Sequence, residues 1–500
     1  MKNVLYTQVQ RSIFHFSLFS VQRFREQLTL VLIALLPFHA LLVTVGTKFL
    51  LGPGHAPMPA LAIWKEILLG PILLFSSGEI FMRVKSEKLK VKNIFLIDLI
   101  DVFILILIGI GITLFFYRPW MTTTGLVLGF KYDFIPLIAF LVLRRVQWSD
   151  QFRARAEGAL LWVAGIVALY GILTVFAPKG YFRLLGYSDA HSLYLPNGPL
   201  AAFQQISGSA IRRVQSTFSG PNQFGIWLLI PLSILATRIF QSKKFKKHES
   251  RILMMFGVCL IVALMLTFSR SAWIGAFVIA AVVGSKHLPR RVFRDALIGI
   301  VSILAIAGVA ASLIAPSVFL RATSTREHIV RPLKAIHEMI RYPLGMGLGA
   351  AGPAANRTHE PCVFLEPGND PSWAKNAPTL CVFVGQTQVQ PANHHCDCAL
   401  LPESWYLQVG VEMGVLGFLL YICLVGVVLS RLAVKSDPSS GSGLKVKNGE
   451  TRTFHFSFFT FLFFLGISIA ALFLHAWEDA AVAYTAWVFV ASNFSKSSSV

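Results

Sequence analysis

Long apolar runs recur along nearly the whole chain, and they restrict the possible fold more than any other feature of the sequence. A helix needs about 20 residues to cross the roughly 30 Å hydrocarbon core of a bilayer. About twelve runs reach or approach that length. They lie near 27–50, 60–82, 94–116, 122–143, 158–177, 222–240, 252–269, 271–286, 295–315, 404–430, 454–474 and 476–493. The sequence therefore predicts an all-α polytopic membrane protein with residues 1–500 in a single membrane domain.

The composition excludes other classes of protein. Charged residues make up only 14% of the chain and hydrophobic residues 55%, whereas a soluble domain carries about 25% charged residues. A chain this apolar is not intrinsically disordered. The net charge of +21 could suggest a nucleic-acid partner, but the basic residues lie in short blocks between apolar runs. That arrangement is typical of membrane topology, so we expect membrane lipids and no nucleic acid as partners.

Lysine and arginine gather in alternate loops, which indicates the orientation in the membrane. Loops rich in these residues stay on the cytoplasmic side. The basic blocks are Arg83, Lys85, Lys88, Lys90 and Lys92; Arg144, Arg145, Arg153 and Arg155; Lys243, Lys244, Lys246, Lys247 and Arg251; and Lys286, Arg290, Arg291 and Arg294. We expect these loops, both termini and the loop 431–453 to be cytoplasmic. The segments 51–59, 117–121, 178–221 and 316–402 should then face outward.

Two of the outward segments, 178–221 and 316–402, are long, and long ordered loops are usually functional. The second separates the ninth and tenth predicted spans. Within it, residues 325–341 carry apolar side chains at roughly helical spacing, with basic side chains among them. One interpretation is a helix that lies in the membrane interface and extends its basic groups toward water. The other is a basic wall that binds an anionic, lipid-linked substrate.

The large outer loop is also rich in cysteine. Cysteines on the outer face of a membrane can oxidise, so we predict two disulfides and leave their pairing open. His394 and His395 next to two of these cysteines could instead form a metal cluster, but the spacing is tighter than in the usual zinc sites. The residues concerned are Cys362, Cys381, Cys396 and Cys398.

Several ionisable residues fall inside predicted spans, where they are functional candidates by default. They are Glu66, Glu79, Asp98, Asp101, Lys131 and Asp133. Either these groups pair with one another or with groups at helix ends, or they form a proton or ion path as in a transporter. The sequence lacks the broken-helix symmetry expected of many secondary transporters, which favours pairing.

Three outward-facing segments carry a distinctive pattern. The first, 212–225, begins with Arg-Arg and continues Val-Gln-Ser-Thr-Phe-Ser-Gly-Pro-Asn; the second, 266–273, reads Leu-Thr-Phe-Ser-Arg-Ser-Ala-Trp. The third, 402–408, reads Pro-Glu-Ser-Trp-Tyr-Leu-Gln and follows a glycine-rich turn at 343–349. Their order and the large loop before the third segment resemble the O-antigen ligase and polymerase family of polytopic glycosyltransferases. The resemblance covers roughly residues 130–430.

That resemblance implies a GT-C-like enzyme that works at the outer face of a prokaryotic cytoplasmic membrane. In the family, a polyprenyl-diphosphate-linked glycan is the donor, and the hydroxyl of a glycan or lipid acceptor attacks the anomeric carbon. No cofactor, nucleotide sugar or metal is expected. The resemblance does not separate a ligase from a polymerase, and it leaves the sugar, the linkage and the acceptor open.

The resemblance also assigns candidate site residues. It implies that Arg213 and Arg270 bind the diphosphate, with Arg212 and Asn222 as further substrate-binding residues. The histidine of the ligase pattern falls on Glu403, as in polymerase-like relatives.

The chemistry supports these assignments, because arginine binds phosphate through two parallel hydrogen bonds and stabilises a departing diphosphate, and a carboxylate can act as a base. The alternatives are an interfacial role for each arginine and a helix-capping role for Glu403. We expect Arg213, Arg270 and Glu403 to converge on one outward-opening cavity, with the carboxylate outside any closed salt bridge.

Two other functions compete with glycan transfer. A transporter or flippase of lipid-linked glycans would also need basic groups, but along a central path from both halves of the bundle. A structural membrane protein would not need these groups to converge at all. The three motifs gather at one predicted face, which favours an enzyme.

Overall fold

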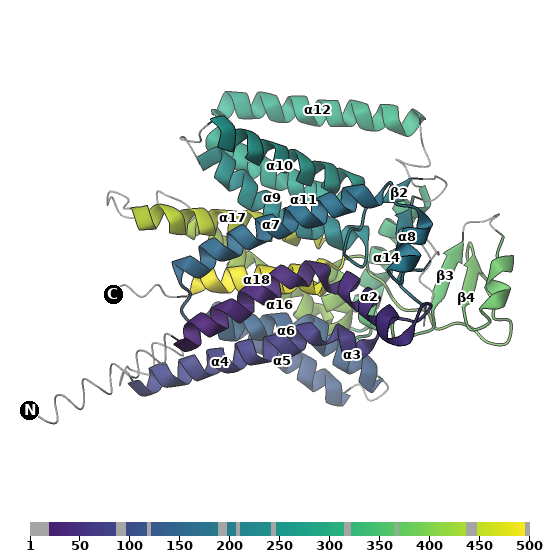
Figure 1. The fold of residues 1–500 in the computed structure, drawn as a ribbon. Coiled ribbons are helices and arrows are strands. Elements are labelled where there is room, and N and C mark those ends of the chain that lie inside the picture. The colour runs from purple at the N-terminus through teal and green to yellow at the C-terminus, as the bar shows by residue number, and fades with distance from the viewer. Residues whose placement is uncertain are drawn as a thin grey trace, which may run out of the picture.

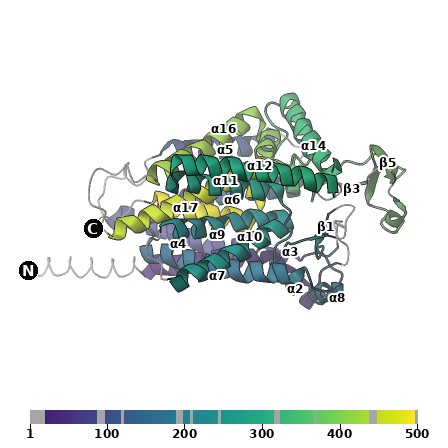
Figure 2. The same cartoon turned by 90° about the horizontal axis from the view of Figure 1, so that it is seen from above.

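The computed structural model describes residues 20–86, 97–117, 122–188, 198–206, 211–241, 247–314, 322–365, 368, 370–436 and 448–495. Long helices run side by side through most of the molecule, and a small β-sheet projects from one end (Figures 1 and 2). Eight of the described helices are long and apolar enough to cross a membrane. They are Ser20–Leu51, Pro59–Val84, Leu99–Tyr117, Thr123–Leu143, Asp150–Thr174, Pro221–Ile239, Arg290–Ile314 and Trp405–Lys435. The protein is therefore a mostly helical, multi-pass membrane protein.

A helix occupies each of the twelve apolar runs predicted from the sequence. The first, Ser20–Leu51, includes η1 (Leu36–Phe38) and α2 (His39–Leu51). The others are α3 (Pro59–Ala62) with α4 (Trp64–Ser86), α5 (Leu99–Tyr117), α6 (Thr123–Leu143), α7 (Asp150–Thr174), α9 (Pro221–Gln241), α10 (Lys247–Leu266), α11 (Arg270–His287), α12 (Arg290–Ile314), α16 (Trp405–Lys435), α17 (Asn448–Ala470) and α18 (Ala480–Phe494). Three of these contain apolar stretches of only 10–17 residues, so a count of twelve crossings stays a prediction.

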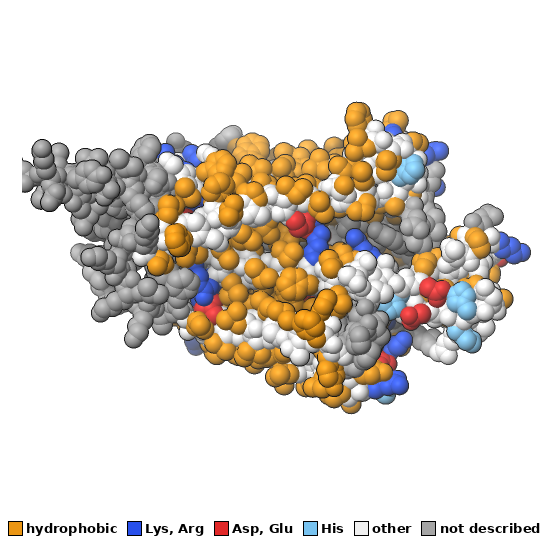
Figure 3. Space-filling model, turned by 90° about the horizontal axis from the view of Figure 1, so that it is seen from below, with side chains coloured by type: hydrophobic (Ala, Val, Ile, Leu, Met, Phe, Trp, Pro, Cys, Tyr) orange, Lys and Arg blue, Asp and Glu red, His pale blue; other side chains and the backbone are white. Residues whose placement is uncertain are grey.

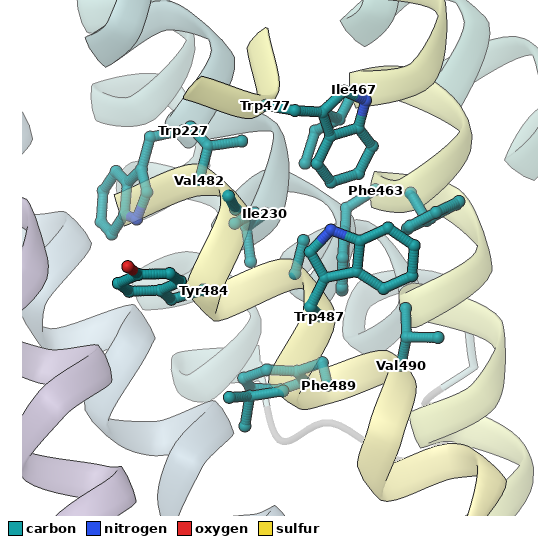
Figure 4. Close-up of a cluster of buried hydrophobic side chains, with 14 of the residues drawn as sticks. Trp227, Ile230, Phe463, Ile467, Trp477, Val482, Tyr484, Trp487, Phe489 and Val490 are labelled. Carbon is teal, nitrogen blue, oxygen red and sulfur yellow. The ribbon is translucent and has the colours of Figure 1, made fainter. Parts of the chain in front are cut away.

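The last helix is short, yet it forms the centre of the bundle. Every residue of α18 from Ala481 to Asn493 is buried, and the helix packs against α6, α9 and α17. Aromatic side chains surround it: the ring of Trp487 lies 5.6 Å from that of Trp477, which belongs to η5 (Ala476–Glu478) (Figure 4). Large aromatic side chains supply much of the packing energy of such cores.

Charged residues inside the spans pair with one another. The Arg25 guanidinium donates to Glu79 at 3.1 Å, Arg144 donates to Asp98 at 2.6 Å and Arg145 lies 3.0 Å from Asp101. Lys131 lies 2.8 Å from Glu66. An ion pair lowers the cost of burying its members, so these contacts support the pairing interpretation over an ion path. Asp133 of α6 is also buried, beside Glu412 of α16.

A sharp break in α16 lets the outer loop enter the bundle. Gly414 has φ of 74° inside the helix, in the left-handed region that glycine adopts most readily. A Cβ at Gly414 would lie 2.2 Å from the Pro343 carbonyl oxygen, so the glycine-rich turn passes directly against the helix. The Glu412 carboxylate accepts a hydrogen bond from the Gly349 amide at 3.0 Å and holds the turn in place.

Both long outer segments contain structure. The first holds α8 (Lys179–Leu184) and the antiparallel pair of β1 (Gln204–Gln205) and β2 (Arg212–Arg213). The second holds α14 (Ala322–Arg341), which confirms the predicted helix, α15 (Gly352–Ala355) and η3 (Ser372–Asn376).

The large loop also forms a sheet of β3 (Cys362–Leu365), β4 (Cys381–Val384) and β5 (Thr387–Gln390). This small sheet belongs to the large loop, while the rest of the described chain is mostly helical, as the all-α expectation has it. Two disulfides tie β3 and β4 to the segment that follows β5. Cys362 bonds to Cys398 and Cys381 bonds to Cys396, which confirms the two predicted disulfides.

The two ends of the bundle differ in chemistry. Basic residues close one end, where Arg153 and Lys435 donate to the carbonyls of Ser492 and Asn493 at the end of α18. Helix α16 continues to Lys435, so it enters the loop predicted at 431–453, of which 437–447 lie outside the described residues. Figure 3 shows a broad apolar band between the ends, with histidine and acidic side chains gathered on the part that projects at the opposite end.

Candidate functional site

A cavity of about 580 Å³ lies at the end of the bundle where the outer segments meet the helices. Its wall includes residues from all parts of the chain, among them Ser219 and Gln223 near the start of α9 and Leu474–Tyr484 around the start of α18. The volume is in the range of small-molecule binding sites. Three of the five site residues assigned from the resemblance line it, namely Arg213, Asn222 and Glu403. Glu66 and Lys131, two of the ionisable residues singled out inside the spans, line it as well.

Arg213 is fixed in place by hydrogen bonds to neutral oxygens. Its Nε donates to the Thr267 carbonyl at 2.9 Å, and one terminal nitrogen donates to the Gln204 side chain at 3.1 Å. The other terminal nitrogen donates to the Asn222 side-chain oxygen at 2.7 Å. Asn222 is in the first turn of α9, whose unpaired backbone amides favour an anion. Arg213 and the start of α9 together therefore form a place where a phosphate group could bind.

Arg212 does not share this position, although it is adjacent in sequence. Neighbouring residues of a strand point to opposite faces. The Arg212 side chain donates to the Ala177 carbonyl at 2.7 Å, lies 4.5 Å from the Phe203 ring and is not among the residues that line the cavity. The expectation that Arg212 binds substrate is therefore not supported.

Arg270 is also absent from the cavity wall, which corrects the expected convergence of three residues. Its motif contributes backbone atoms instead of the arginine side chain. The Thr267 and Phe268 carbonyls accept hydrogen bonds from Arg213, at 2.9 and 3.4 Å, while Arg270 begins α11. The tight turn directs these carbonyls at Arg213 because Phe268 is in a left-handed conformation, with φ of 49°.

Glu403 lies in the cavity but is held by basic side chains, contrary to expectation. Arg331 of α14 donates to its Oε1 at 2.7 Å, and His328 of the same helix contacts its Oε2. Burial alone would raise the pKa of Glu403, but the His328 hydrogen bond and the Arg331 charge outweigh burial and lower that pKa. The carboxylate is therefore ionised at neutral pH and neutralised by its partners. A sequence spacing of 72 residues gave no sign of this pairing.

Strained backbone marks all three sequence motifs. The non-glycine residues with positive φ in the described part of the chain are Ser216, Phe268 and Glu403, with φ of 54°, 49° and 53°. Each belongs to a different motif. Such conformations cost free energy and persist where the surrounding structure enforces them, commonly at functional sites. Their coincidence with the motifs supports a functional origin for the sequence pattern.

His475 is a further candidate that the sequence analysis missed. It lies between α17 and α18, lines the cavity, and neither of its ring nitrogens has a hydrogen-bond partner among the described residues. Burial lowers the pKa of His475 to about 4, although the nearby Glu403 charge opposes that shift. The imidazole is therefore neutral at pH 7. A histidine at the boundary of two apolar runs was the available signal, since such a position is close to a membrane surface.

Helix α14 has features of both alternatives considered for residues 325–341. Ile329, Leu333 and Ile340 are more than half exposed, at 57%, 59% and 68%, so one side is an apolar surface. Arg331 and His328 of the same helix line the cavity. The described part of α14 thus has both an exposed apolar surface suited to a membrane interface and basic residues in the site.

The outer cysteines contribute no thiolate to a metal site. All four form disulfides, which removes them from the alternative cluster with His394 and His395. His394 instead contacts Glu360 at 2.7 Å in the exposed loop. No protein-family model matches the chain, and no curated protein matches it.

Proposed function

We propose that this protein is a membrane glycosyltransferase that transfers or polymerises a polyprenyl-diphosphate-linked glycan. In this proposal the chain crosses a prokaryotic cytoplasmic membrane twelve times, with both termini cytoplasmic and the cavity open to the outside. The acceptor is a hydroxyl group of a glycan or lipid. The proposal joins the family resemblance of the three motifs to the chemistry of the cavity.

One observation carries the proposal. Residues from distant parts of the sequence line one cavity at the end of an apolar bundle. They are Arg213 and Asn222, the ion pair of Arg331 and Glu403, and His475. A lipid-linked diphosphate needs this combination, because its prenyl chain stays in the membrane while its charged group must be bound outside the hydrocarbon. Each of the three motifs also holds one non-glycine residue with positive φ, a strain that is common at functional sites.

Arg213 and the amides that begin α9 are assigned to the diphosphate of the donor. Arginine keeps its charge, and its guanidinium can exchange hydrogen bonds to neutral oxygens for stronger ones to phosphate oxygens. During transfer, the bond between the anomeric carbon and the phosphate oxygen breaks, and the diphosphate leaves with the electron pair. Positive charge placed at that oxygen in advance stabilises the departing group.

The acceptor hydroxyl loses a proton as its oxygen bonds to the anomeric carbon. We assign His475 to this proton, because its imidazole is neutral at pH 7 and its ring nitrogens have no hydrogen-bond partner among the described residues. Glu403 is close enough to act on the charge of His475 and would stabilise the imidazolium that forms. Glu403 is then a positioning and electrostatic residue, and not the base expected from the sequence.

A flippase of lipid-linked glycans is the alternative. Such a protein would need charged groups along a path through the bundle. In the described residues, most charged groups of the spans form ion pairs, as Arg25 does with Glu79 and Arg144 with Asp98. The basic groups that line the cavity also gather at one end. These observations favour transfer over transport.

The test is a transfer assay with the purified chain in liposomes that contain a polyprenyl-diphosphate-linked glycan. Arg213→Lys keeps the charge but loses the planar fork, and we expect it to lower the rate of transfer by about 10²-fold or more. Arg212→Lys is the matched control, because it keeps a cation at a site outside the cavity, and it should retain most activity. Movement of the glycan lipid across the bilayer without transfer to an acceptor would favour the flippase instead.

A further inference from the structure

A second group of basic side chains lines the same cavity and belongs to none of the three motifs. It consists of His39 of α2, Lys65 of α4, Lys131 of α6 and Arg357, which follows α15; we call it the Lys65 cluster. Lys65, Lys131 and Arg357 are all close enough to His39 to act on its charge. Three cations around one imidazole are unusual in a chain with only 14% charged residues.

We propose that the Lys65 cluster is a second anion-binding site, which holds a phosphate or carboxylate group of the glycan acceptor. That the molecule bearing this anionic group is the glycan acceptor rests on the proposed function. The preference for an anion rests on the hydrogen bonds and charges of the cluster alone.

The hydrogen bonds of His39 leave two donors facing each other. The Trp64 indole donates to His39 Nδ1 at 3.0 Å. An indole is a donor only, so Nδ1 must be the acceptor and the neutral ring must carry its proton on Nε2. The Lys65 ammonium, which also has only donors, donates to the Ala62 carbonyl at 2.8 Å and lies 3.3 Å from that Nε2. An oxygen of a bound anion that accepts from both groups would satisfy this arrangement.

The charges of the cluster also favour a bound anion. Lys65 is 6% exposed, and an ammonium that is buried to this extent needs negative charge nearby. Glu66 is shared between the two lysines, 3.5 Å from Lys65 and 2.8 Å from Lys131. Arg357 is exposed, and its guanidinium has no hydrogen bond or ion pair among the described residues.

Two further acids line this part of the cavity without cancelling the excess charge. One carboxylate oxygen of Glu478 is buried without a hydrogen-bond partner among the described residues, and such burial disfavours a charge. Asp479 is moreover engaged at the start of α18, where its carboxylate accepts from the Ala481 amide at 2.9 Å. A ligand that brings its own negative charge would therefore balance Lys65, Lys131 and Arg357.

Binding of small charged sugars to the purified full chain in lipid nanodiscs tests this proposal without any donor lipid. Glucose 6-phosphate and methyl glucuronide are the probes, with methyl glucoside as the neutral reference, and isothermal titration calorimetry measures the affinity. We expect at least one charged probe to bind about tenfold or more tightly than the neutral sugar. The probe that binds more tightly shows whether phosphate or carboxylate is the preferred group.

Variants locate the bound anion. Arg357→Gln should lower the affinity for the charged probe by about tenfold or more. Lys131→Met should lower this affinity too. Lys334→Gln is the matched control, because Lys334 is exposed on α14 and does not line the cavity.

Three results would overturn the proposal. They are equal affinity for charged and neutral sugars, unchanged binding in Arg357→Gln, and a loss of binding in Lys334→Gln as large as that in Arg357→Gln. A neutral Lys65 that accepts a hydrogen bond from His39 Nε2 would produce the first of these. If charged sugars bind as expected while no variant of Arg213 affects glycan transfer, the second site stands and the proposed function fails.

Discussion

Arg331 donates a hydrogen bond to the Glu403 carboxylate at 2.7 Å, although the two residues are 72 positions apart in the sequence. The contact joins α14 of the large outer loop to the residue that precedes the N-cap of α16. It closes one side of the cavity and keeps a carboxylate ionised there. The ion pair thus links the position of the outer loop to the chemistry of the site.

The stability losses from removing each member of this pair should not be additive. Arg331→Gln leaves the Glu403 charge partly buried without its main partner, and we expect a loss of about 1–3 kcal/mol in the free energy of unfolding. Glu403→Gln should cost a similar amount. The double variant should cost less than the sum of the two, because neither charge remains uncompensated. Thermal unfolding of the four proteins in detergent measures this coupling, and strictly additive losses would contradict it.

Transfer activity should persist to lower pH than an ordinary histidine allows. The pKa of His475 is lowered to about 4, so its neutral form is kept from pH 7 down to that value. The acid limb of the kcat profile should therefore lie well below pH 6.5. The free energy of unfolding should fall as the pH drops from about 6.5 toward 4, because the histidine of the unfolded chain takes up a proton at about pH 6.5 and His475 of the folded chain does not.

His475→Gln should lower kcat by about 10²–10⁴-fold and abolish the acid limb assigned to the imidazole. His455→Gln is a matched control, since His455 does not line the cavity. An unchanged rate and pH profile in His475→Gln would remove His475 from the proposed mechanism.

The two disulfides should stabilise the outer sheet unequally. Cys362–Cys398 spans 36 residues and Cys381–Cys396 spans 15. Each bond stabilises by about 2–4 kcal/mol, and the chain-entropy model assigns roughly 0.8 kcal/mol more to the longer loop. Limited proteolysis of the two paired Cys→Ser variants should therefore cut the loop faster when the longer bridge is lost. Equal protection in both variants would show that entropy does not set the order.

The orientation can be tested with single cysteines in a variant that lacks Cys259 and Cys423, the two cysteines outside the disulfides. Lys179 is exposed on α8 in the first outer segment, and Ser285 is exposed near the end of α11 at a predicted cytoplasmic loop. A membrane-impermeant maleimide should label Lys179→Cys in intact cells. It should label Ser285→Cys only after the membrane is permeabilised. The opposite pattern would invert the topology and place the cavity on the cytoplasmic side.

The sequence by itself determined the helices, because each needs only a local run of apolar residues to be recognised. Helices occupy all twelve predicted runs, and the amphipathic stretch at 325–341 is helical. The two disulfides were predictable too, because the four cysteines lie in a long loop that the sequence predicts to face outward. The strained residues of the three motifs lie within segments that the sequence had already singled out.

The tertiary structure decided which of those residues meet. Arg213 and Arg212 differ only in the face of a two-residue strand, and packing directs one into the cavity and the other to the Ala177 carbonyl. Glu403 pairs with Arg331, and His475 lies beside them, through contacts between segments that no local pattern relates. Even the central position of α18 follows from the aromatic packing around Trp487, not from its hydropathy. Local periodicity specifies a helix, but long-range packing and charge pairing determine which side chains share a site.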